Sequence, residues 1–394
     1  MVRTSHRAAP ETTALFGDNA PSSLRVALLL GGLPVGGAEV NVVALLPRLV
    51  AHGVAPVVVT LARDSDSFLA ERIEAEGCPR VDLGARRLLD FSAIRRLRAF
   101  LRSEQISVLH AEDLYSVIVG ALAVRGTNTR FVLTRHVLGH DRRPRREAVK
   151  SILGYLGAWR ADAVIAVSQA VRTKFAAQAH LPSSRITVIH NGLELAPFEE
   201  LRDRSTARDH LAWNESQLTV SIIGVMRQCK GHDTLLAAVP AIRDAFPDVA
   251  VKIIGGGEVP SELRAQVDAL AGTVEFVGER SDIPEVLTAT DIVVQASRSE
   301  GLPTVMMEAG AAGIPVVATD VGGTRDVVED GATGLLVPPE DPQALAAAVV
   351  QLLGSPERRR AMGLNARASI LRRFSLDRQA QLTADLYCRL AADA

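Results

Sequence analysis

A loop that could bind a phosphorylated ligand follows the predicted strand Ile292–Gln295. The loop contains Glu300 and Gly301 and ends at Pro303. Proline suits the first turn of a helix, because its ring fixes φ and its missing N–H costs nothing there. The loop is therefore expected at a helix N-terminus, where free backbone N–H groups favour an anion such as phosphate.

Two carboxylates mark this segment, Glu300 in the loop and Glu308 in the predicted helix, with seven residues between them. Glu308 would lie about a turn and a half inside the helix, from where it could reach the hydroxyl pair of a ribose. Two solvated helix carboxylates would show the same spacing. The preceding strand, the glycine and the proline favour a binding site.

A basic turn follows the predicted strand Thr219–Gly224. It contains Arg227 and Lys230. Together these cations could neutralise a diphosphate, the arginine through paired hydrogen bonds and the lysine as a point charge. Taken alone, the turn could equally be a basic helix cap.

Two further segments follow predicted strands in the first half of the chain. Gly36 and Gly37 belong to a glycine-rich loop, where missing side chains would let the backbone approach a ligand. Their spacing is not the dinucleotide pattern GxGxxG. His136 comes just after the predicted strand Phe131–Thr134, and a lone histidine of this kind is more often structural.

Short apolar segments alternate with amphipathic ones in both halves of the chain. This alternation predicts an α/β fold with parallel sheets covered by helices on both faces, and ligands at the carboxyl ends of the strands. It pauses at 191–217, which indicates two doubly wound domains. The predicted strands are Arg25–Leu30, Ala55–Leu61, Ile106–His110, Phe131–Thr134, Ala163–Val167, Ile186–Ile189, Thr219–Gly224, Ala250–Ile254, Val274–Val277, Ile292–Gln295, Val316–Ala318 and Leu335–Val337. Helices predicted in the first half are Ala38–Ala51, Phe68–Glu76, Phe91–Ser103, Tyr115–Val124 and Gln169–Ala179.

Length and composition fit two globular domains. The chain has 394 residues, of which 47% are hydrophobic, 23% charged and only 4% aromatic. These values exclude a collagen-like repeat and a wholly disordered chain. The three cysteines, Cys78, Cys229 and Cys388, are too far apart for a metal motif and indicate structural thiols.

Charge is distributed unevenly although the net charge is only −1. Residues 24–190 contain 23 Lys and Arg against 14 Asp and Glu, and residues 191–394 contain 19 against 29. The two halves could face different partners or attract each other. Nucleic acid is not an expected partner, because aromatic side chains that could stack on bases are scarce.

In this order the four segments resemble the GT-B-fold glycosyltransferases, specifically the large retaining family 4. The resemblance runs from about residue 24 and includes Asp162–Ser168, Val188–Glu194 and Gly331–Pro338. It implies two facing Rossmann-like, doubly wound parallel-sheet domains. The implied parts are an N-terminal acceptor-binding domain at 24–190, a C-terminal nucleotide-sugar-binding domain at 191–375 and a C-terminal helix at 376–394 that returns to the N-terminal domain. Residues 1–23, with Pro10, Pro21 and small polar residues, predict a flexible tail.

The resemblance also implies a role for each residue of the reaction centre. Glu300 would hold the hydroxyls of the donor sugar, and Arg227 and Lys230 the diphosphate. His136 would lie beside the anomeric carbon. The implied donor-binding residues are Glu308 at the ribose, Gly301, Leu302 and Pro303 at the phosphates and sugar, and Gly36 and Gly37 from the opposite domain.

The activity that the resemblance implies is retaining transfer from a UDP- or GDP-sugar to a glycan or lipid-linked acceptor, in cell-surface polysaccharide or glycolipid synthesis. Fixed cations and a helix N-terminus would stabilise the leaving diphosphate, so neither a metal nor another cofactor is expected. Two alternatives are a sugar-nucleotide isomerase of the UDP-N-acetylglucosamine 2-epimerase type and a catalytically silent sugar-nucleotide binder.

Asp64 and Asp66 have the DxD spacing of a metal–nucleotide site, but they stand far from the donor segments, and a capped helix start is expected there instead. The first 23 residues lack the apolar run of a signal peptide, and glycines break the apolar stretch 26–47. We therefore expect a cytoplasmic protein.

A contact with an anionic membrane is a further expectation. Basic residues gather at 86–102 and 142–150, with apolar residues such as Ile94 and Leu101 between them. Such a surface could attach the protein to the inner face of the cytoplasmic membrane. A solvated basic face would account for the same residues.

Overall fold

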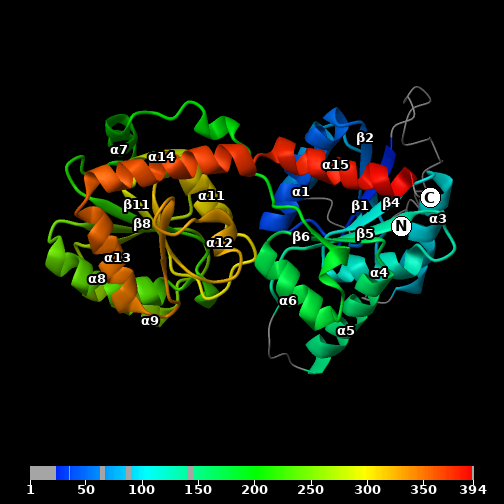
Figure 1. The fold of residues 1–394 in the computed structure, drawn as a ribbon, viewed down its shortest axis with the longest axis horizontal. Helices are drawn as coiled ribbons and strands as arrows, with labels where there is room; N and C mark the ends of the chain where they lie inside the picture. Colours follow the sequence, from blue (N-terminus) through cyan, green and yellow to red (C-terminus); the bar gives the residue numbers. More distant parts are fainter. Residues whose placement is uncertain (1–23, 35, 63–66, 86–89, 140–144, 393–394) are drawn as a thin grey trace, which may run out of the picture. The chain divides into compact units, whose positions relative to one another are not determined.

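The computed structural model describes residues 24–34, 36–62, 67–85, 90–139 and 145–392, and these residues form two parallel β-sheets with helices around each (Figure 1). The chain divides into two compact units. The first unit contains residues 1–134, 144–164 and 380–394, and the second contains 135–143 and 165–379. The predicted tail at 1–23 lies outside the described residues, and the predicted domain limits stay predictions.

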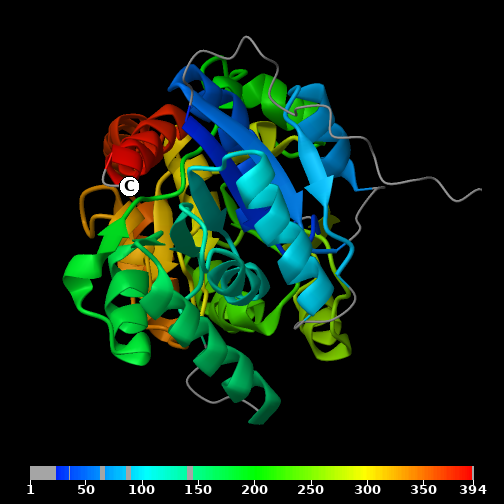
Figure 2. The ribbon, with the colours of Figure 1, turned by 90° about the vertical axis from the view of Figure 1, so that its right-hand side faces the viewer.

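The first sheet has seven strands in the order β3-β2-β1-β4-β5-β6-β7. Its centre pairs in parallel, with β1 between β2 and β4 (Figure 2). The buried side chains of β1 and β2 are almost all aliphatic, as expected for strands covered on both faces. The strands are β1 (Leu24–Leu30), β2 (Val54–Thr60), β3 (Arg80–Asp82), β4 (Val108–Ala111), β5 (Arg130–Arg135), β6 (Ala163–Ala166) and β7 (Ile186–Val188).

Helices and one short 3-10 segment connect these strands. They are α1 (Gly37–Ala51), α2 (Phe68–Ala75), α3 (Phe91–Ser103), α4 (Leu114–Ala123), α5 (Arg145–Arg160), α6 (Gln169–Ala179) and η1 (Ser183–Arg185). Local caps fix several starts: Asp90 accepts the N–H groups of Ser92 and Ala93 before α3, and Asp113 forms a capping box with Ser116 before α4.

The second sheet has six parallel strands in the order β10-β9-β8-β11-β12-β13. The strands are β8 (Thr219–Ile223), β9 (Ala250–Ile254), β10 (Val274–Gly278), β11 (Ile292–Gln295), β12 (Val316–Thr319) and β13 (Gly334–Val337). The remaining elements are η2 (Ala196–Phe198), α7 (Arg204–Leu211), η3 (Gln228–Lys230), α8 (His232–Ala245), α9 (Ser261–Ala269), α10 (Ile283–Ala289), α11 (Thr304–Ala311), α12 (Thr324–Val327), α13 (Pro342–Leu353), α14 (Pro356–Arg373) and α15 (Leu376–Ala392).

Alternate residues of the second sheet belong to two hydrophobic cores. Ile222 and Val294 pack in one core with α8 and α13, whereas Ile223 and Val293 pack in the other with α10, α11 and α14 (Figure 1). Since side chains alternate across a strand, this arrangement means that helices cover both faces. The predicted doubly wound α/β fold is therefore confirmed.

The sequence pattern does not predict two elements of the first unit. Strand β3 is only three residues long, too short for a periodic signal. Helix α5 covers part of the second basic segment, for which the sequence analysis predicts no helix. Elsewhere the predicted strands are confirmed with ends that differ by at most two residues, and Ala250–Ile254 and Ile292–Gln295 agree at both ends.

The end of α15 belongs to the first unit. The hydroxyl of Tyr387 lies 2.5 Å from Nδ1 of His110 on β4, whose Nε2 lies 2.7 Å from Oγ1 of Thr134. Arg130 Nε donates to the carbonyl of Leu390 at 3.1 Å. These buried polar contacts fix the last helix of the chain to β4 and β5.

The expectation of a membrane face on α3 is wrong for its apolar side chains. Ile94 and Leu101 are 5% and 1% exposed, so they belong to the core. Arg96, Arg98 and Arg102 donate to backbone carbonyls of the same unit. Residues 86–89 of the same basic stretch, and 142–144 of the second, lie outside the described part of the chain.

Candidate active site

The basic turn between β8 and α8 packs directly against the end of β11. Gly231 has φ +69°, and a Cβ on it would lie 1.9 Å from the carbonyl oxygen of Ala296. Only glycine permits this approach. The backbone N–H of Arg298 donates to the carbonyl of Cys229 at 2.8 Å, and its guanidinium to that of Gln228 at 2.7 Å. The basic turn after β8 and the loop after β11 are therefore in direct backbone contact.

Glu300 is held by three donors. Lys230 Nζ, Gln295 Nε2 and Ser297 Oγ donate to its Oε1 at 2.8, 2.8 and 2.7 Å. The carboxylate is only 8% exposed. Among the described residues no donor reaches Oε2. A buried carboxylate with one oxygen fully engaged has a fixed orientation and leaves the second oxygen to a ligand.

Gln295 and Ser297 are functional candidates that the sequence reasoning missed. Gln295 ends a strand of otherwise apolar residues and is 2% exposed. Its Nε2 also donates to Ser297 Oγ at 2.7 Å. The carbonyl of Ser297 accepts from Thr319 Oγ1 at 2.5 Å, which ties the loop to β12. A polar residue at the end of a buried strand was the available signal.

The loop after β12 and the segment after β5 both contact the backbone beside Glu300. Gly322 has φ +53°, and a Cβ on it would lie 1.8 Å from the Glu300 carbonyl oxygen, which accepts from the N–H of Gly323 at 3.1 Å. A Cβ on Gly301 would lie 2.1 Å from the carbonyl of His136. His136 therefore lies beside the predicted donor loop within the second unit.

Pro303 is the N-cap of α11, one residue earlier than the first turn that the sequence predicted. Leu302 is half-buried next to it. Helix α11 begins at Thr304, so Gly301 and Leu302 lie at its N-terminus as expected.

Glu308 is the fifth residue of α11 and has a different environment from Glu300. Burial raises the pKa of its carboxyl to about 7. No side chain among the described residues forms a hydrogen bond or an ion pair with it. At neutral pH this carboxyl is therefore poised between its neutral and ionised forms.

The cations of the basic turn are not equivalent. Lys230 is half-buried in its ion pair with Glu300. Arg227 is exposed, and its guanidinium has no partner in the described part of the chain. His232, the first residue of α8, is 4% exposed, and burial lowers the pKa of its imidazole to about 4. The ring is neutral at physiological pH, so the positive charge of this turn resides on Arg227 and Lys230.

Gly36 and Gly37 stand in the first unit, as the N-cap and first residue of α1. The structure brings together the other eight predicted residues at the carboxyl ends of strands or on α11 within the second unit. Asp64 and Asp66 lie outside the described residues. In the described part of the chain no three His, Cys, Asp or Glu side chains cluster as metal ligands would.

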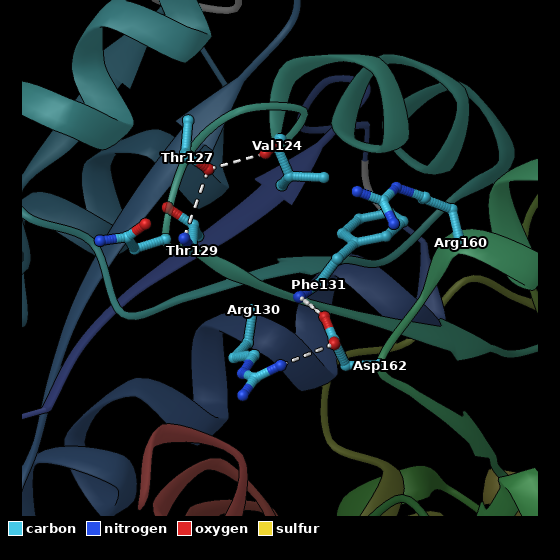
Figure 3. Close-up of a pocket in the computed structure, with 8 residues that line it drawn as sticks. Val124, Thr127, Thr129, Arg130, Phe131, Arg160 and Asp162 are labelled. Carbon is cyan, nitrogen blue, oxygen red and sulfur yellow. Dashed lines mark hydrogen bonds and ion pairs between the residues drawn. The ribbon is translucent and has the colours of Figure 1, made fainter. Parts of the chain in front are cut away.

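A cavity of about 640 Å³ in the first unit is not the predicted site (Figure 3). Its lining includes Arg130, which begins β5, and Asp162, which precedes β6. Asp162 accepts from the N–H of Phe131 at 2.7 Å and pairs with Arg130 at 3.2 Å, so its charge is compensated within the wall. The cavity lies at the amino ends of the strands, whereas ligands of parallel sheets bind at the carboxyl ends.

The architecture defines the chain as a GT-B-fold protein. The structure of Anabaena HepE in complex with UDP has a TM-score of 0.82 to this chain at 23% identity, covering 93% of this chain and all of that one. Residues 203–369 match the family model "Glycosyl transferases group 1", and residues 35–196 match "Glycosyltransferase Family 4". The chain belongs to the group 1 glycosyltransferases.

Sequence relatives agree with this assignment. The lipopolysaccharide core biosynthesis mannosyltransferase LpsB of Rhizobium meliloti is 32% identical over 237 residues, 58% of this chain and 66% of that protein. The D-inositol 3-phosphate glycosyltransferase of Nocardioides sp. is 28% identical over 398 residues, 91% of this chain and 86% of that protein. Within the described ranges, no helix combines the length and apolarity needed to cross a membrane.

Proposed function

We propose that this glycosyltransferase is a retaining, metal-independent enzyme that transfers a sugar from a UDP- or GDP-sugar to a glycan or lipid-linked acceptor. The observation that carries the proposal is the Glu300 carboxylate, held through Oε1 by Lys230, Gln295 and Ser297 beside the N-terminus of α11. An oriented carboxylate next to cations and free N–H groups fits a sugar attached to a diphosphate.

Each end of the donor has a matching group in the second unit. The exposed guanidinium of Arg227 and the ammonium of Lys230 would bind the diphosphate. Glu308 would accept hydrogen bonds from the ribose hydroxyls, and Glu300 Oε2 from a sugar hydroxyl. The UDP complex of HepE, which has this fold, supports a nucleotide donor.

Catalysis would rest on stabilising the leaving diphosphate. As the sugar–phosphate bond breaks, negative charge grows on the phosphate oxygens, and the pre-positioned cations and the N-terminus of α11 lower its energy. Lys230 Nζ pairs with Glu300 Oε1 at 2.8 Å, so its ammonium would stand between this carboxylate and the diphosphate of the donor. Retention would follow if the acceptor attacks on the face from which the phosphate departs.

The membership in group 1 leaves the acceptor open. We place the reaction in the cytoplasm, in polysaccharide or glycolipid synthesis, with Gly36 and Gly37 on the phosphate side of the site and His136 beside the anomeric carbon. The contact of the Gly301 backbone with that of His136 supports the last of these placements.

A donor screen with product analysis tests the proposal. Thermal shifts with a panel of UDP- and GDP-sugars identify the donor, because a ligand of the folded state raises stability by mass action. NMR of the product formed in EDTA should then show a retained anomeric configuration. Release of a C2-inverted sugar without acceptor would identify an isomerase. Tight binding of a sugar nucleotide without turnover would identify a silent binder. Activity that disappears with EDTA and returns with manganese would refute metal independence.

A further inference from the structure

The guanidinium of Arg298 joins three loops at the carboxyl edge of the second sheet. Arg298 itself stands in the loop after β11. Its Nη1 donates to the carbonyl of Gln228 in the basic turn after β8 at 2.7 Å, and its Nε donates to Oε1 of Glu340 after β13 at 2.8 Å. Nη1 and Nη2 donate to the two carboxylate oxygens of Asp233, on α8, at 2.9 and 2.7 Å. One side chain therefore fixes the loops after β8, β11 and β13 to one another, and we call these four hydrogen bonds the Arg298 clamp.

The clamp depends on the shape of a guanidinium as well as on its charge. Two N–H groups face the two oxygens of Asp233, and further N–H groups of the same rigid plane reach Gln228 and Glu340. An ammonium has three donors on one atom and cannot reach all of these acceptors. The hydrogen bond from Arg298 is the main cause that holds the pKa of the Asp233 carboxyl below its usual range. A lysine at this position would keep the charge and lose the clamp.

Arg298 is not placed to bind the donor. Its side chain is 24% exposed, and all three of its guanidinium nitrogens donate to oxygen atoms of the protein. The carboxylates of Asp233 and Glu340 balance its charge. The exposed guanidinium of Arg227 is in the opposite situation. Among these two arginines, the diphosphate of a donor would therefore meet Arg227.

The clamp acts on the backbone that carries Lys230. The N–H of Arg298 donates to the carbonyl of Cys229 at 2.8 Å, and its guanidinium holds the carbonyl of Gln228. These are the two residues immediately before Lys230, and the three together form η3. Two residues after Arg298 the chain reaches Glu300, whose Oε1 lies 2.8 Å from Lys230 Nζ. Both partners of this ion pair therefore belong to segments that Arg298 fixes.

We propose that Arg298 is a positioning residue of the sugar-transfer reaction, which holds the ammonium of Lys230 in place beside Glu300 without touching the donor. The inference rests on the proposed function, because it assigns Lys230 to the leaving diphosphate. Without the clamp the basic turn is free to shift relative to the loop after β11. A displacement of the ammonium by a fraction of an ångström would weaken the stabilisation of the developing charge, so the loss should appear in kcat.

Transfer kinetics of Arg298→Met and Arg298→Lys, together with donor Kd from isothermal titration, test the proposal. In both variants kcat should fall about 10- to 100-fold while the donor Kd stays within about threefold of the wild type. The matched control is Arg202→Met, which removes an exposed guanidinium that pairs with Glu285 at 3.0 Å in the same unit and should leave both values unchanged. Full activity of Arg298→Lys would show that charge alone suffices, and a raised donor Kd at constant kcat would show that Arg298 binds the donor. Either result would overturn the proposal.

Asp233→Asn keeps the inference testable if the Arg298 variants do not fold. The substitution keeps the shape of the side chain and removes the charge of the clamp's bidentate acceptor, which is 48% exposed. We expect kcat to fall about three- to tenfold at nearly constant donor Kd. A normal kcat in this variant would contradict a role of the clamp in the reaction.

A double-mutant cycle with Lys230→Met shows whether Arg298 acts through Lys230. Once the ammonium is absent, adding Arg298→Met should lower kcat by less than about a further threefold. Losses that multiply fully would overturn the proposal, because Arg298 would then act independently of Lys230. If Lys230→Met alone left kcat unchanged, the proposed site and the clamp would both fall. If Lys230→Met were impaired and Arg298→Met were normal, only the clamp would fall.

Discussion

The two carboxylates of the segment 300–308 lie in the same unit but meet opposite environments. Glu300 receives three donors, one of them an ammonium, whereas Glu308 has no partner in the described chain and its pKa is raised to about 7. The first is a carboxylate whose Oε1 is oriented by donors of the protein itself. The second is a half-buried carboxyl that no described side chain contacts, so its oxygens are available to the hydroxyl groups of a ligand.

This difference indicates that Glu300 and Glu308 have different roles, one in the chemical step and one in donor binding. A carboxylate that the protein already orients can position a sugar without reorganising, which affects the rate of the chemical step. A carboxyl that lacks partners gains most when hydroxyl donors arrive, which affects affinity. Substitutions around Glu300 should therefore change kcat, and substitutions of Glu308 should change donor binding.

The largest effect is expected from Lys230→Met. The variant keeps an unbranched side chain one atom shorter but removes the charge that faces both Glu300 and the proposed diphosphate. We expect kcat to fall about 100- to 1,000-fold, the usual cost of losing one group that stabilises developing charge. Steady-state transfer kinetics measure this, and Lys252→Met, which breaks the Lys252–Glu275 pair of the same unit, is the control. An unchanged kcat would remove Lys230 from the reaction centre.

Glu308→Ala should weaken donor binding and have less effect on the chemical step. We expect the donor Kd to rise about 10- to 100-fold, because hydrogen bonds to a charged group are worth roughly 1.5–3 kcal/mol. At saturating donor, kcat should change less than in Lys230→Met. Isothermal titration with the identified nucleotide provides the Kd, and the control is Glu357→Ala, which changes an exposed glutamate in the first turn of α14. A loss confined to kcat would contradict the division of roles.

The sequence predicts those features that depend on local pattern alone. The apolar strands, Pro303 before α11 and the basic turn after β8 were all predictable from local pattern. It could not find Gln295 as a partner of Glu300, because that contact depends on how the end of β11 meets the loop. It also assigned a membrane face to α3, since amphipathic spacing does not say which side faces the core.

Gln295→Leu should have a smaller effect than either change above. Gln295 acts through Glu300, as a positioning residue, and its removal leaves the Lys230 and Ser297 contacts in place. We expect kcat to fall about tenfold, with donor Kd nearly unchanged. Gln351→Leu on the exposed side of α13 is the control. A rise in donor Kd with constant kcat would show that Gln295 supports binding and not the orientation of Glu300.

The dependence of stability on pH provides a further comparison of the two carboxyls. Because the pKa of Glu308 in the folded chain is about 7 and that of a free glutamate about 4.5, the folded state retains a proton that the unfolded state has lost between these values. The free energy of unfolding should therefore fall as pH rises from 4.5 to 7.

Glu308→Gln cannot ionise, so above pH 7 its free energy of unfolding should exceed that of the wild type by on the order of 3 kcal/mol and match it near pH 4.5. Glu300→Gln should instead be less stable than the wild type at pH 8, because the ammonium of Lys230 loses its counter-charge. Urea unfolding at both pH values measures the two differences. Equal signs for the two variants at pH 8 would mean that the carboxyls do not differ as the geometry indicates.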